Sequence, residues 1–327
     1  KALEELETII GKETNKNLKN IYKEVKKHYK FFIKYKVPNV NPLFVDPETK
    51  EVGTLPSIHQ VIGIYNIVKD KRFAIADKCG TGKTAIAVLA TGLIKEKIKK
   101  EGKKLHNKFI IVCPDNAKEA WKKGLMGNGS ERYLKNKKEV AIITAKNKKD
   151  FLKEIENKEF IVLTYSLLPT KSKSDYIVDE LLNIGYDGVI LDEGHIPKKP
   201  NKIRSNAVDR LVLGNYKKTK ELPYLTILSG TLIDDKPKDI EQILHYLNPI
   251  KYKNADVVKE KLKGNPRLIA IELGKYMLRR NYNLLNKSYK KCKEVPIELD
   301  ENQREIYEKL YEWSRSVKNT NWLPTLR

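Results

Sequence analysis

The sequence predicts an α/β fold, a mostly parallel sheet with helices on both faces, and two observations carry this prediction. Six short apolar runs rich in β-branched residues alternate with longer segments of helical pattern from about residue 58 onward. Each run is apolar almost throughout, which is typical of strands buried on both faces of a parallel sheet. Such sheets bind ligands at the carboxyl ends of their strands, so we expect the functional residues in the loops that follow the runs.

The expected elements follow one another as strand and helix. The strands are expected at 72–76, 108–113, 139–144, 159–165, 187–193 and 224–230. The helices are expected at 83–100, 116–124, 148–156, 174–184 and 236–247. No internal repeat stands out, and we expect a single lobe.

An N-terminal extension, residues 1–54, precedes this pattern. Residues 1 to about 35 are rich in Lys, Glu and Tyr and carry apolar residues at helical intervals, among them Leu3, Leu6 and Ile9. We expect one or two amphipathic helices there, followed by an irregular connector with Pro, Asn and Gly. The extension matches no motif. A nucleic-acid arm and a partner-binding helix both fit it, and we favour packing against the main lobe with a basic outer face.

The charge balance is strongly basic. The 327 residues include 65 Lys and Arg against 42 Asp and Glu, a formal net charge of +23. This favours a polyanionic partner such as nucleic acid, although a Lys-rich solvated surface is the alternative. No apolar run approaches the roughly 20 residues of a membrane helix, and the charged N-terminus does not resemble a secretory leader. The three cysteines lack metal-ligand spacing, so we expect reduced thiols in a cytoplasmic protein, with a nucleoid or viral setting also compatible.

The stretch ADKCGTGKT, residues 76–84, joins the first expected strand to a helix. Gly80 and Gly82 let the backbone turn tightly and bring its N–H groups against phosphate oxygens. The start of the helix adds partial positive charge. Lys83 can reach the β- and γ-phosphates of a nucleotide, and the Thr84 hydroxyl can ligate Mg²⁺. The stretch therefore predicts ATP and Mg²⁺ as cofactors.

The stretch VILDEGH ends another buried strand with an acidic pair. Asp192 is expected to hold the Mg²⁺ through water, and Glu193 stands where a base can polarise the attacking water. An isolated Asp-Glu pair is usually part of a solvated loop, but this chain also contains the glycine-rich loop. The sequence therefore predicts catalytic roles for Lys83, Asp192 and Glu193, with Thr84 and Asp192 as the magnesium ligands.

These motifs and several others stand in the order of the superfamily 2 helicases, and the chain resembles the DNA translocases of the Swi/Snf family. ADKCGTGKT is similar to the first motif of that family, in which Asp opens the loop, and this accounts for Asp77. LPSIHQVIGIYNI resembles the segment whose Gln, here Gln60, contacts adenine. IIVCPDNAKEAWKKG, VLTYSLL, LDEGHIPKKPNKIRS and LTILSGTLIDDKPKDIEQILHYLNP resemble the motifs that follow. The resemblance covers roughly residues 55–313, and Leu232 departs from it where the family usually has Pro.

The resemblance implies a RecA-like lobe of the P-loop NTPase class, which binds ATP and drives translocation on DNA. The residues expected to bind the nucleotide are Gln60, Cys79, Gly80, Thr81, Gly82, Lys83, Thr84 and Ala85. The resemblance also implies that His195, Ser229 and Thr231 couple the nucleotide state to motion. The alternatives are a satisfied loop histidine for His195 and a cap of the following helix for the two hydroxyls, and the order of the motifs favours coupling.

Nucleic acid is expected across the carboxyl end of the sheet, held by salt-sensitive phosphate contacts. The candidate contacts are Lys118, Lys122, Lys123, Thr164, Lys198, Lys199 and Arg204. Each lysine is equally compatible with a solvated surface charge. Trp121 is expected in the core of its helix rather than as a stacking platform. One of Arg279 and Arg280 is expected to pair with an acidic group of the first lobe.

The resemblance divides the chain into the basic extension (1–54), a first ATPase lobe (55–275) and a hinge segment (276–327) that leads toward a second lobe with an arginine finger. The leading hypothesis is an ATP-dependent translocase on double-stranded DNA. The alternatives are an RNA helicase of the same superfamily and a non-hydrolysing DNA-binding scaffold with a vestigial motor fold. The intact Lys83, Thr84, Asp192 and Glu193 argue against the scaffold.

Overall fold

The computed structural model describes the central part of the chain. The described ranges are 56, 58–126, 139–145, 147–168, 176–194, 202–230 and 237–280, with isolated helical residues at 23, 26, 301, 304, 305, 308 and 309. The side chains of residues 58, 202–205 and 237–239 lie outside the description, as does nearly all of the N-terminal extension. The chain divides into two compact units, residues 1–286 and 287–327. In the second unit, Lys309 Nζ lies 2.5 Å from Glu305 Oε1.

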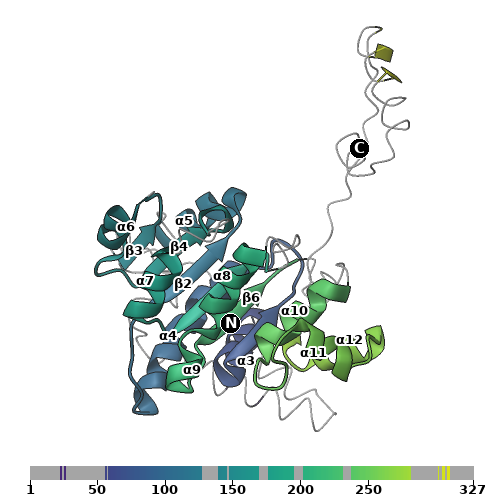
Figure 1. Cartoon of the computed structure of the whole chain (residues 1–327), viewed down its shortest axis with the longest axis horizontal. Helices are drawn as coiled ribbons and strands as arrows, with labels where there is room; N and C mark the ends of the chain where they lie inside the picture. Colours follow the sequence, from purple (N-terminus) through teal and green to yellow (C-terminus); the bar gives the residue numbers. More distant parts are fainter. Residues whose placement is uncertain are drawn as a thin grey trace. The chain divides into compact units, whose positions relative to one another are not determined.

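A seven-stranded, fully parallel sheet forms the centre of the first unit (Figure 1). Its strands are β1 (Arg72–Ile75), β2 (Phe109–Cys113), β3 (Val140–Ile142), β4 (Phe160–Thr164), β5 (Gly188–Asp192), β6 (Tyr224–Leu228) and β7 (Met277–Leu278). Their spatial order is β3-β4-β2-β5-β6-β1-β7. The six predicted strands are confirmed. The short edge strand β7 was not predicted, and it pairs with β1 although it falls in the segment 276–327 that the sequence assigns to the hinge.

The register of the central strands determines where the phosphate loop and the acidic pair lie. Ile75 of β1 and Asp192 of β5 are both paired with Leu228 of β6. The carboxyl ends of β5, β6 and β1 therefore lie level and next to one another. Because these strands are parallel, the loops that follow them leave the sheet at the same edge.

Helices follow the strands as the pattern predicted, and additional helices precede β1, lie between β5 and β6, and precede β7. They are α3 (Ile58–Asp70), α4 (Lys83–Lys100), α5 (Lys118–Met126), α6 (Lys148–Ile155), α7 (Tyr176–Ile184), α8 (Lys202–Leu213), α9 (Tyr216–Thr219), α10 (Pro237–Leu247), α11 (Ala255–Lys261) and α12 (Pro266–Gly274). The 3₁₀ turns η1 (Asp115–Ala117) and η4 (Tyr165–Leu167) follow β2 and β4. The five predicted helices are confirmed to within about three residues at each end.

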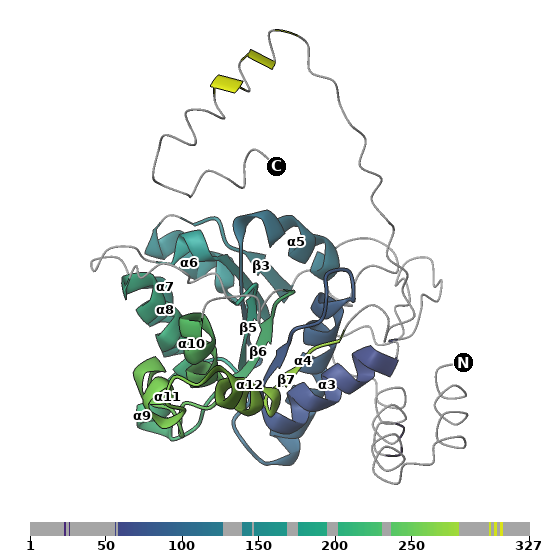
Figure 2. The ribbon, with the colours of Figure 1, turned by 90° about the vertical axis from the view of Figure 1, so that its right-hand side faces the viewer.

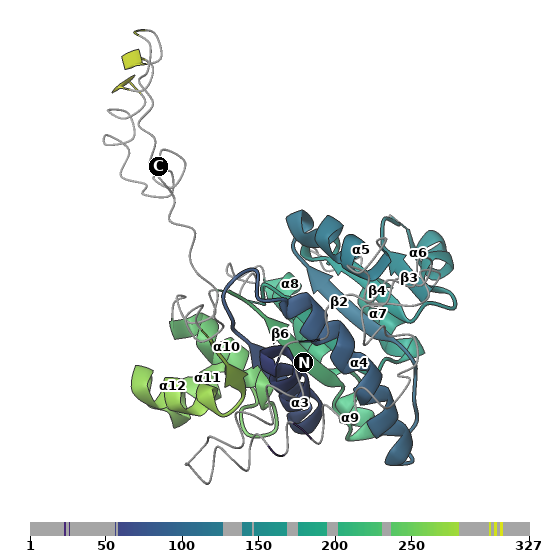
Figure 3. The ribbon, with the colours of Figure 1, turned by 180° about the vertical axis from the view of Figure 1, so that it is seen from behind.

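The helices form a layer on each face of the sheet. Helices α3, α4 and α5 lie on one side, and α6, α7, α8 and α10 on the other (Figure 2). Seen from behind, α3 and α4 lie side by side across the near face (Figure 3). Strand residues alternate between the two cores, since Phe73 and Ile75 pack under α3 and α4 while Ala74 and Ala76 face the other layer. This double burial explains why the strands are apolar almost throughout.

The described residues bear on two expectations from the sequence, the lack of a membrane helix and the state of the cysteines. Within these residues, no helix is long and apolar enough to cross a bilayer. Cys79, which is exposed, and Cys113, which is buried, are thiols that form no disulfide within the described part of the chain. Burial raises the pKa of Cys113 to about 12, so that thiol stays protonated at neutral pH. Cys292 lies outside the described residues.

An ion-pair cluster holds α12 against the α10–α11 connection and predicts acid sensitivity. Burial raises the pKa of Glu272, but hydrogen bonds from Lys251 and Lys275 outweigh it and bring the pKa to about 2. A carboxylate whose pKa is lowered on folding stabilises above its unfolded value, here 4.5, and loses this contribution as the pH falls toward 2. Because both lysines are about half exposed, we expect Glu272→Gln to lower the free energy of unfolding at pH 7 by about 1–2 kcal/mol.

Urea unfolding at pH 7, 4.5 and 3 measures this difference, which should shrink steadily below pH 4.5. Glu260→Gln on the exposed face of α11 is the matched control and should show no such trend. A Glu272→Gln difference that stays constant from pH 7 to pH 3 would contradict the assignment.

Candidate nucleotide-binding site

The phosphate loop, residues 76–82, follows β1 and leads into α4. Gly80 and Gly82 have φ of 75° and 81°, which only glycine adopts readily. The Lys83 ammonium lies across this loop and donates to the carbonyl oxygens of Asp77 (2.9 Å) and Lys78 (3.2 Å). Phosphate oxygens can take the place of these carbonyl oxygens as acceptors for the ammonium. The position of Lys83 therefore suits its predicted role in binding phosphate, which stays a prediction.

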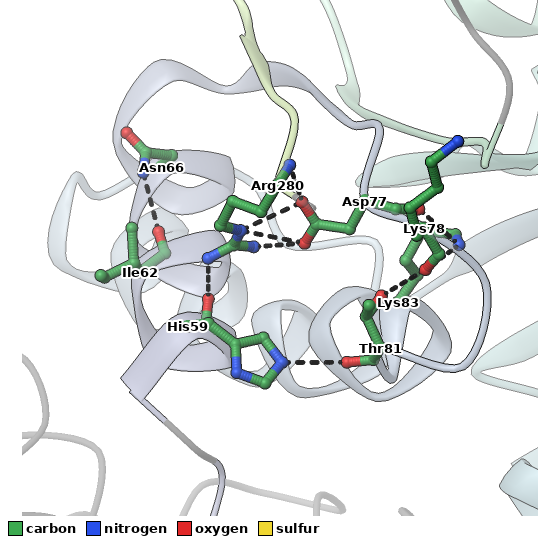
Figure 4. Close-up of polar contacts among 8 residues, drawn as sticks. All are labelled: His59, Ile62, Asn66, Asp77, Lys78, Thr81, Lys83 and Arg280. Carbon is green, nitrogen blue, oxygen red and sulfur yellow. Dashed lines mark hydrogen bonds and ion pairs between the residues drawn. The ribbon is translucent and has the colours of Figure 1, made fainter. Parts of the chain in front are cut away.

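Asp77 begins the phosphate loop and explains why this position is not glycine. Its carboxylate is fully buried and accepts bonds from the Arg280 backbone N–H (2.9 Å) and from the Arg280 Nε (3.0 and 3.1 Å), with a further bond from the guanidinium (Figure 4). Arg280 also donates to the backbone carbonyl of His59 on α3. The expected pairing of one hinge arginine with an acid of the first lobe is therefore present, and the acid belongs to the phosphate loop itself.

Helix α3 also contacts the phosphate loop. His59 Nε2 is 3.1 Å from the carbonyl oxygen of Thr81 (Figure 4). The Gln60 amide nitrogen would lie only 2.3 Å from a Cβ on Gly82, so it nearly touches the loop backbone. Gln60 is thus beside the phosphate loop, and its contact with adenine stays a prediction. The sequence did not single out His59.

A methyl group at Gly82 should damage the loop in two ways. Gly82→Ala forces a left-handed residue to carry a Cβ and also displaces the Gln60 amide. We expect about tenfold weaker binding of a fluorescent ATP analogue, since 1.4 kcal/mol of strain and lost contact corresponds to that factor. Gly102→Ala is the control, because Gly102 has φ of 66° with open space around it and lies in the turn after α4. Equal affinities of the two variants would contradict the role of the loop.

Asp192 ends β5 and is held from several directions. Its Oδ2 accepts a 2.7 Å bond from the Trp121 indole, and its Oδ1 accepts the backbone N–H of Glu193 (3.1 Å). The Tyr165 hydroxyl donates to the Asp192 backbone carbonyl (3.1 Å). Burial raises the pKa of Asp192, while the Trp121 bond and the charge of Lys83 lower it. The level ends of β1 and β5 place the phosphate loop and Asp192 at the same edge of the sheet, as the prediction of a shared magnesium nucleotide requires.

Glu193 stands in a strained backbone conformation next to Asp192. Its φ is 47°, in the left-handed region that glutamate seldom adopts. The carboxylate accepts a 3.0 Å bond from the hydroxyl of Ser229, which is fully buried just after β6. Gly194 follows directly, and a Cβ there would lie 2.5 Å from Ile227, so only glycine lets the chain turn this close to β6. The turn fixes the side-chain direction of Glu193.

The segment after β6 also reaches the phosphate loop. A Cβ on Gly230 would lie 3.0 Å from the Cys79 sulfur, so the tip of the loop and this segment are in contact. Ser229 therefore touches the acidic pair while its neighbour touches the phosphate loop. This is the arrangement expected for coupling, but the function of Ser229 stays a prediction. His195 and Thr231 lie outside the described residues.

The arrangement fits a magnesium nucleotide by its donor set. A loop of backbone N–H groups and an ammonium can receive phosphates, and Thr84 at the start of α4 offers a hydroxyl. Asp192 offers carboxylate oxygen on the neighbouring edge of the sheet, the kind of ligand that Mg²⁺ prefers. Ala85 is buried in α4 and offers only its backbone N–H.

The candidate nucleic-acid contacts differ in accessibility. Lys122 and Lys123 are exposed on α5, and Lys118 is half-buried at its start. Thr164, in contrast, is only 3% exposed, and its hydroxyl lies 2.7 Å from the Ser166 hydroxyl. A direct phosphate contact from Thr164 is therefore wrong for this conformation. Lys198, Lys199 and the Arg204 side chain lie outside the described residues.

Sequence reasoning missed the exposed partners of Thr164. Ser166 donates to Asp115 Oδ1 (2.6 Å), and this bond lowers the pKa of Asp115. The Asp115 carboxylate therefore stays charged at the carboxyl edge of the sheet. Trp121 is 1% exposed, as expected of a core residue, but its bond to Asp192 was also missed. The signal in the sequence was the indole N–H of Trp121, because a buried tryptophan usually donates this group to a hydrogen-bond acceptor.

Comparisons with known proteins point to one family. The family model described as the SNF2-related domain matches residues 66–323, which include the phosphate loop, the acidic pair and Ser229 but not Gln60. The human DNA annealing helicase and endonuclease ZRANB3 is 26% identical over 189 residues, 58% of this chain and 15% of that protein. The DNA repair and recombination protein RAD54 of Saccharomyces cerevisiae is 26% identical over 289 residues, 75% of this chain and 29% of that protein.

A solved structure agrees with the fold. The Sulfolobus solfataricus SWI2/SNF2 ATPase core in complex with dsDNA superposes with a TM-score of 0.52 at 20% identity, covering 87% of this chain and 56% of that chain. At this identity the likeness shows the fold alone. The chain spans less than a third of either curated relative.

Proposed function

The chain belongs to the SNF2-related domain family, and from this premise we propose that it is the nucleotide-binding lobe of a motor that uses ATP to move along double-stranded DNA. One observation carries the proposal. Lys83, the Asp192–Glu193 pair and Ser229 follow or end β1, β5 and β6, whose carboxyl ends lie level and next to one another, and Ser229 donates directly to Glu193. A scaffold without hydrolysis would not need this convergence of a cation, two acids and a hydroxyl.

Each residue has a distinct part in the proposed reaction. The phosphate loop and Lys83 bind the β- and γ-phosphates. Thr84 and Asp192 would hold Mg²⁺, which would neutralise negative charge on the phosphate oxygens. Glu193 accepts a proton from the attacking water, and Ser229 orients its carboxylate. Glu193 is half-buried, which limits competing water around its carboxylate.

The duplex is proposed to lie across the segments that follow β2 and β4. Lys122 and Lys123 are exposed on α5, the helix that follows β2, and the net charge of +23 supports a polyanionic ligand. The solved SWI2/SNF2 ATPase core is in complex with dsDNA, and RAD54 is a DNA repair and recombination protein, which makes duplex DNA our first choice over RNA.

We also propose that a second RecA-like lobe acts with this one. This chain matches 56% of the solved core and carries one set of nucleotide-binding motifs. A second lobe would add an arginine finger, which contributes about 10³–10⁵ in rate in related phosphoryl-transfer sites. The first lobe alone should therefore bind nucleotide weakly and hydrolyse it slowly.

The test compares nucleic acids as activators of ATP hydrolysis by the full-length protein. Duplex DNA should stimulate hydrolysis more than single-stranded RNA, and ATP should drive displacement of the third strand from a DNA triplex. Stronger stimulation by RNA would favour the RNA helicase. No hydrolysis under any of these conditions would favour the non-hydrolysing scaffold, and hydrolysis that no nucleic acid stimulates would overturn the proposal.

Salt dependence tests where the duplex binds. The logarithm of the binding constant should fall linearly with the logarithm of salt concentration, by about 0.9 per phosphate contact. Lys122→Gln should reduce this slope by about 1. Lys217→Gln is the control, because Lys217 is exposed on α9, which precedes β6 and so lies toward the opposite edge of the sheet. A binding constant that does not change with salt concentration would contradict the proposal that the duplex binds at the α5 surface.

A further inference from the structure

Two buried aromatic residues from separate segments donate to the same aspartate. The Trp121 indole N–H bonds to the Asp192 carboxylate at 2.7 Å, and the Tyr165 hydroxyl bonds to the Asp192 backbone carbonyl at 3.1 Å. Trp121 is 1% exposed, Tyr165 is 3% exposed and Asp192 is half-buried, so both bonds are partly shielded from water. A shielded hydrogen bond to a charged carboxylate is stronger than one in water.

The two aromatic residues come from the segments that are proposed to meet DNA. Trp121 lies on α5 between the half-buried Lys118 and the exposed Lys122, so one face of this short helix is turned to solvent and the other to Asp192. Tyr165 directly follows β4 and precedes Ser166, whose hydroxyl is exposed at the same edge. Each segment thus has an exposed polar side and a buried link to the magnesium ligand.

A surface network joins the two segments to each other. Ser166 donates to Asp115, which begins the 3₁₀ turn before α5, and shares a bond with Thr164. Movement of either segment therefore changes the position of the other. Both movements reach Asp192, one at its side chain and one at its backbone.

Resting on the proposed function, we propose that Trp121 and Tyr165 are positioning residues that transmit nucleic-acid binding on α5 and after β4 to the Asp192 carboxylate. Phosphate contact by the α5 lysines shifts the helix and with it the indole N–H. The indole holds one carboxylate oxygen, so its position decides how that carboxylate is directed toward Mg²⁺. Tyr165 fixes the backbone from which the carboxylate projects. DNA binding then alters the rate of hydrolysis without any contact between DNA and the nucleotide.

A purely structural role for these residues makes a different prediction. If they only fill the core, their replacement lowers stability and leaves the ratio of DNA-stimulated to basal hydrolysis unchanged. If they transmit binding, that ratio falls while DNA affinity is kept. The ratio therefore separates the two roles even when a variant is somewhat less stable.

The experiment uses Tyr165→Phe and Trp121→Phe in the full-length protein. Tyr165→Phe removes only a hydroxyl, and Tyr186→Phe is its matched control, because the buried Tyr186 hydroxyl donates to the Leu211 carbonyl (2.6 Å) and Tyr186 precedes β5, whereas Asp192 ends that strand. Hydrolysis is measured with and without duplex DNA across a magnesium titration, together with duplex affinity and thermal melting.

We expect the stimulation ratio to fall about 3- to 10-fold in Tyr165→Phe and about 10-fold or more in Trp121→Phe, the bond to a charged group being the stronger. Half-saturating magnesium should rise in Trp121→Phe, duplex affinity should stay within about twofold, and Tyr186→Phe should match the wild type. If Trp121→Phe does not fold, Tyr165→Phe decides alone.

A fluorescence measurement gives a readout that does not depend on hydrolysis. The chain has three tryptophans, and replacing Trp313 and Trp322 by phenylalanine leaves Trp121 as the reporter. Duplex DNA added without nucleotide should change its emission. A normal stimulation ratio in both variants, or a silent Trp121 signal in a protein that duplex DNA does stimulate, overturns this inference and leaves the proposed function standing. A wild type that duplex DNA does not stimulate overturns both.

Discussion

Glu193→Gln should lower the DNA-stimulated rate of ATP hydrolysis by about 10²–10⁴, the factor that a positioned general base contributes. The glutamine is close in shape to glutamate and keeps an oxygen for the Ser229 hydroxyl, so the strained turn at residue 193 should survive. What disappears is the ability to accept a proton from the attacking water. Steady-state hydrolysis with duplex DNA, together with binding of a fluorescent ATP analogue, measures both properties.

Nucleotide affinity should change little in this variant, because Lys83 and the phosphate loop are untouched. Glu96→Gln on α4 is the control, since Glu96 is a surface residue whose pair with Lys99 is long at 3.9 Å. Unchanged hydrolysis in Glu193→Gln would remove the catalytic assignment and favour a non-hydrolysing DNA-binding scaffold.

Arg280→Met should cost about 3–5 kcal/mol of folding free energy, because it leaves the fully buried Asp77 carboxylate without its charged partner. The double variant Asp77→Asn with Arg280→Met should recover part of this loss, since a neutral amide is cheaper to bury than an unpaired charge. Urea unfolding of the two single variants and the double variant measures the coupling.

An exposed pair of the same chemistry gives the comparison. Arg210 and Asp179 form an ion pair between α8 and α7 with side chains 41% and 54% exposed. Arg210→Met should therefore cost less than about 1 kcal/mol. Similar losses in Arg210→Met and Arg280→Met would show that the Asp77 pair does not stabilise the phosphate loop in the way its burial indicates.

The Asp77–Arg280 pair also has a consequence for the candidate nucleotide site. Arg280, in the segment that follows β7, bonds Asp77 near the start of the phosphate loop. It also bonds the carbonyl of His59 near the start of α3. Three segments that surround the nucleotide site therefore share one guanidinium. We expect Arg280→Lys to be intermediate in stability, because an ammonium cannot reproduce the paired bonds of the planar guanidinium.

The sequence by itself predicted six of the seven strands of the described sheet, five of the helices, and the places of the phosphate loop and the acidic pair at the ends of strands. It could do so because these signals are local. Apolar runs buried on both faces, a helix start after a glycine-rich loop and an acidic pair at the end of a run each lie within about ten residues of chain.

The tertiary structure alone decided the spatial strand order, the inclusion of β7 in the sheet and the partners of the site residues. Arg280 meets Asp77 across 203 residues, Trp121 meets Asp192 across 71, and Ser229 meets Glu193 across 36. No periodicity records such pairings, because they depend on which strands become neighbours and on which polar atoms burial leaves to be satisfied. Thr164 is an example. It was expected to contact phosphate, but it is buried and bonds Ser166, which in turn links the segment after β4 to Asp115 in the segment after β2.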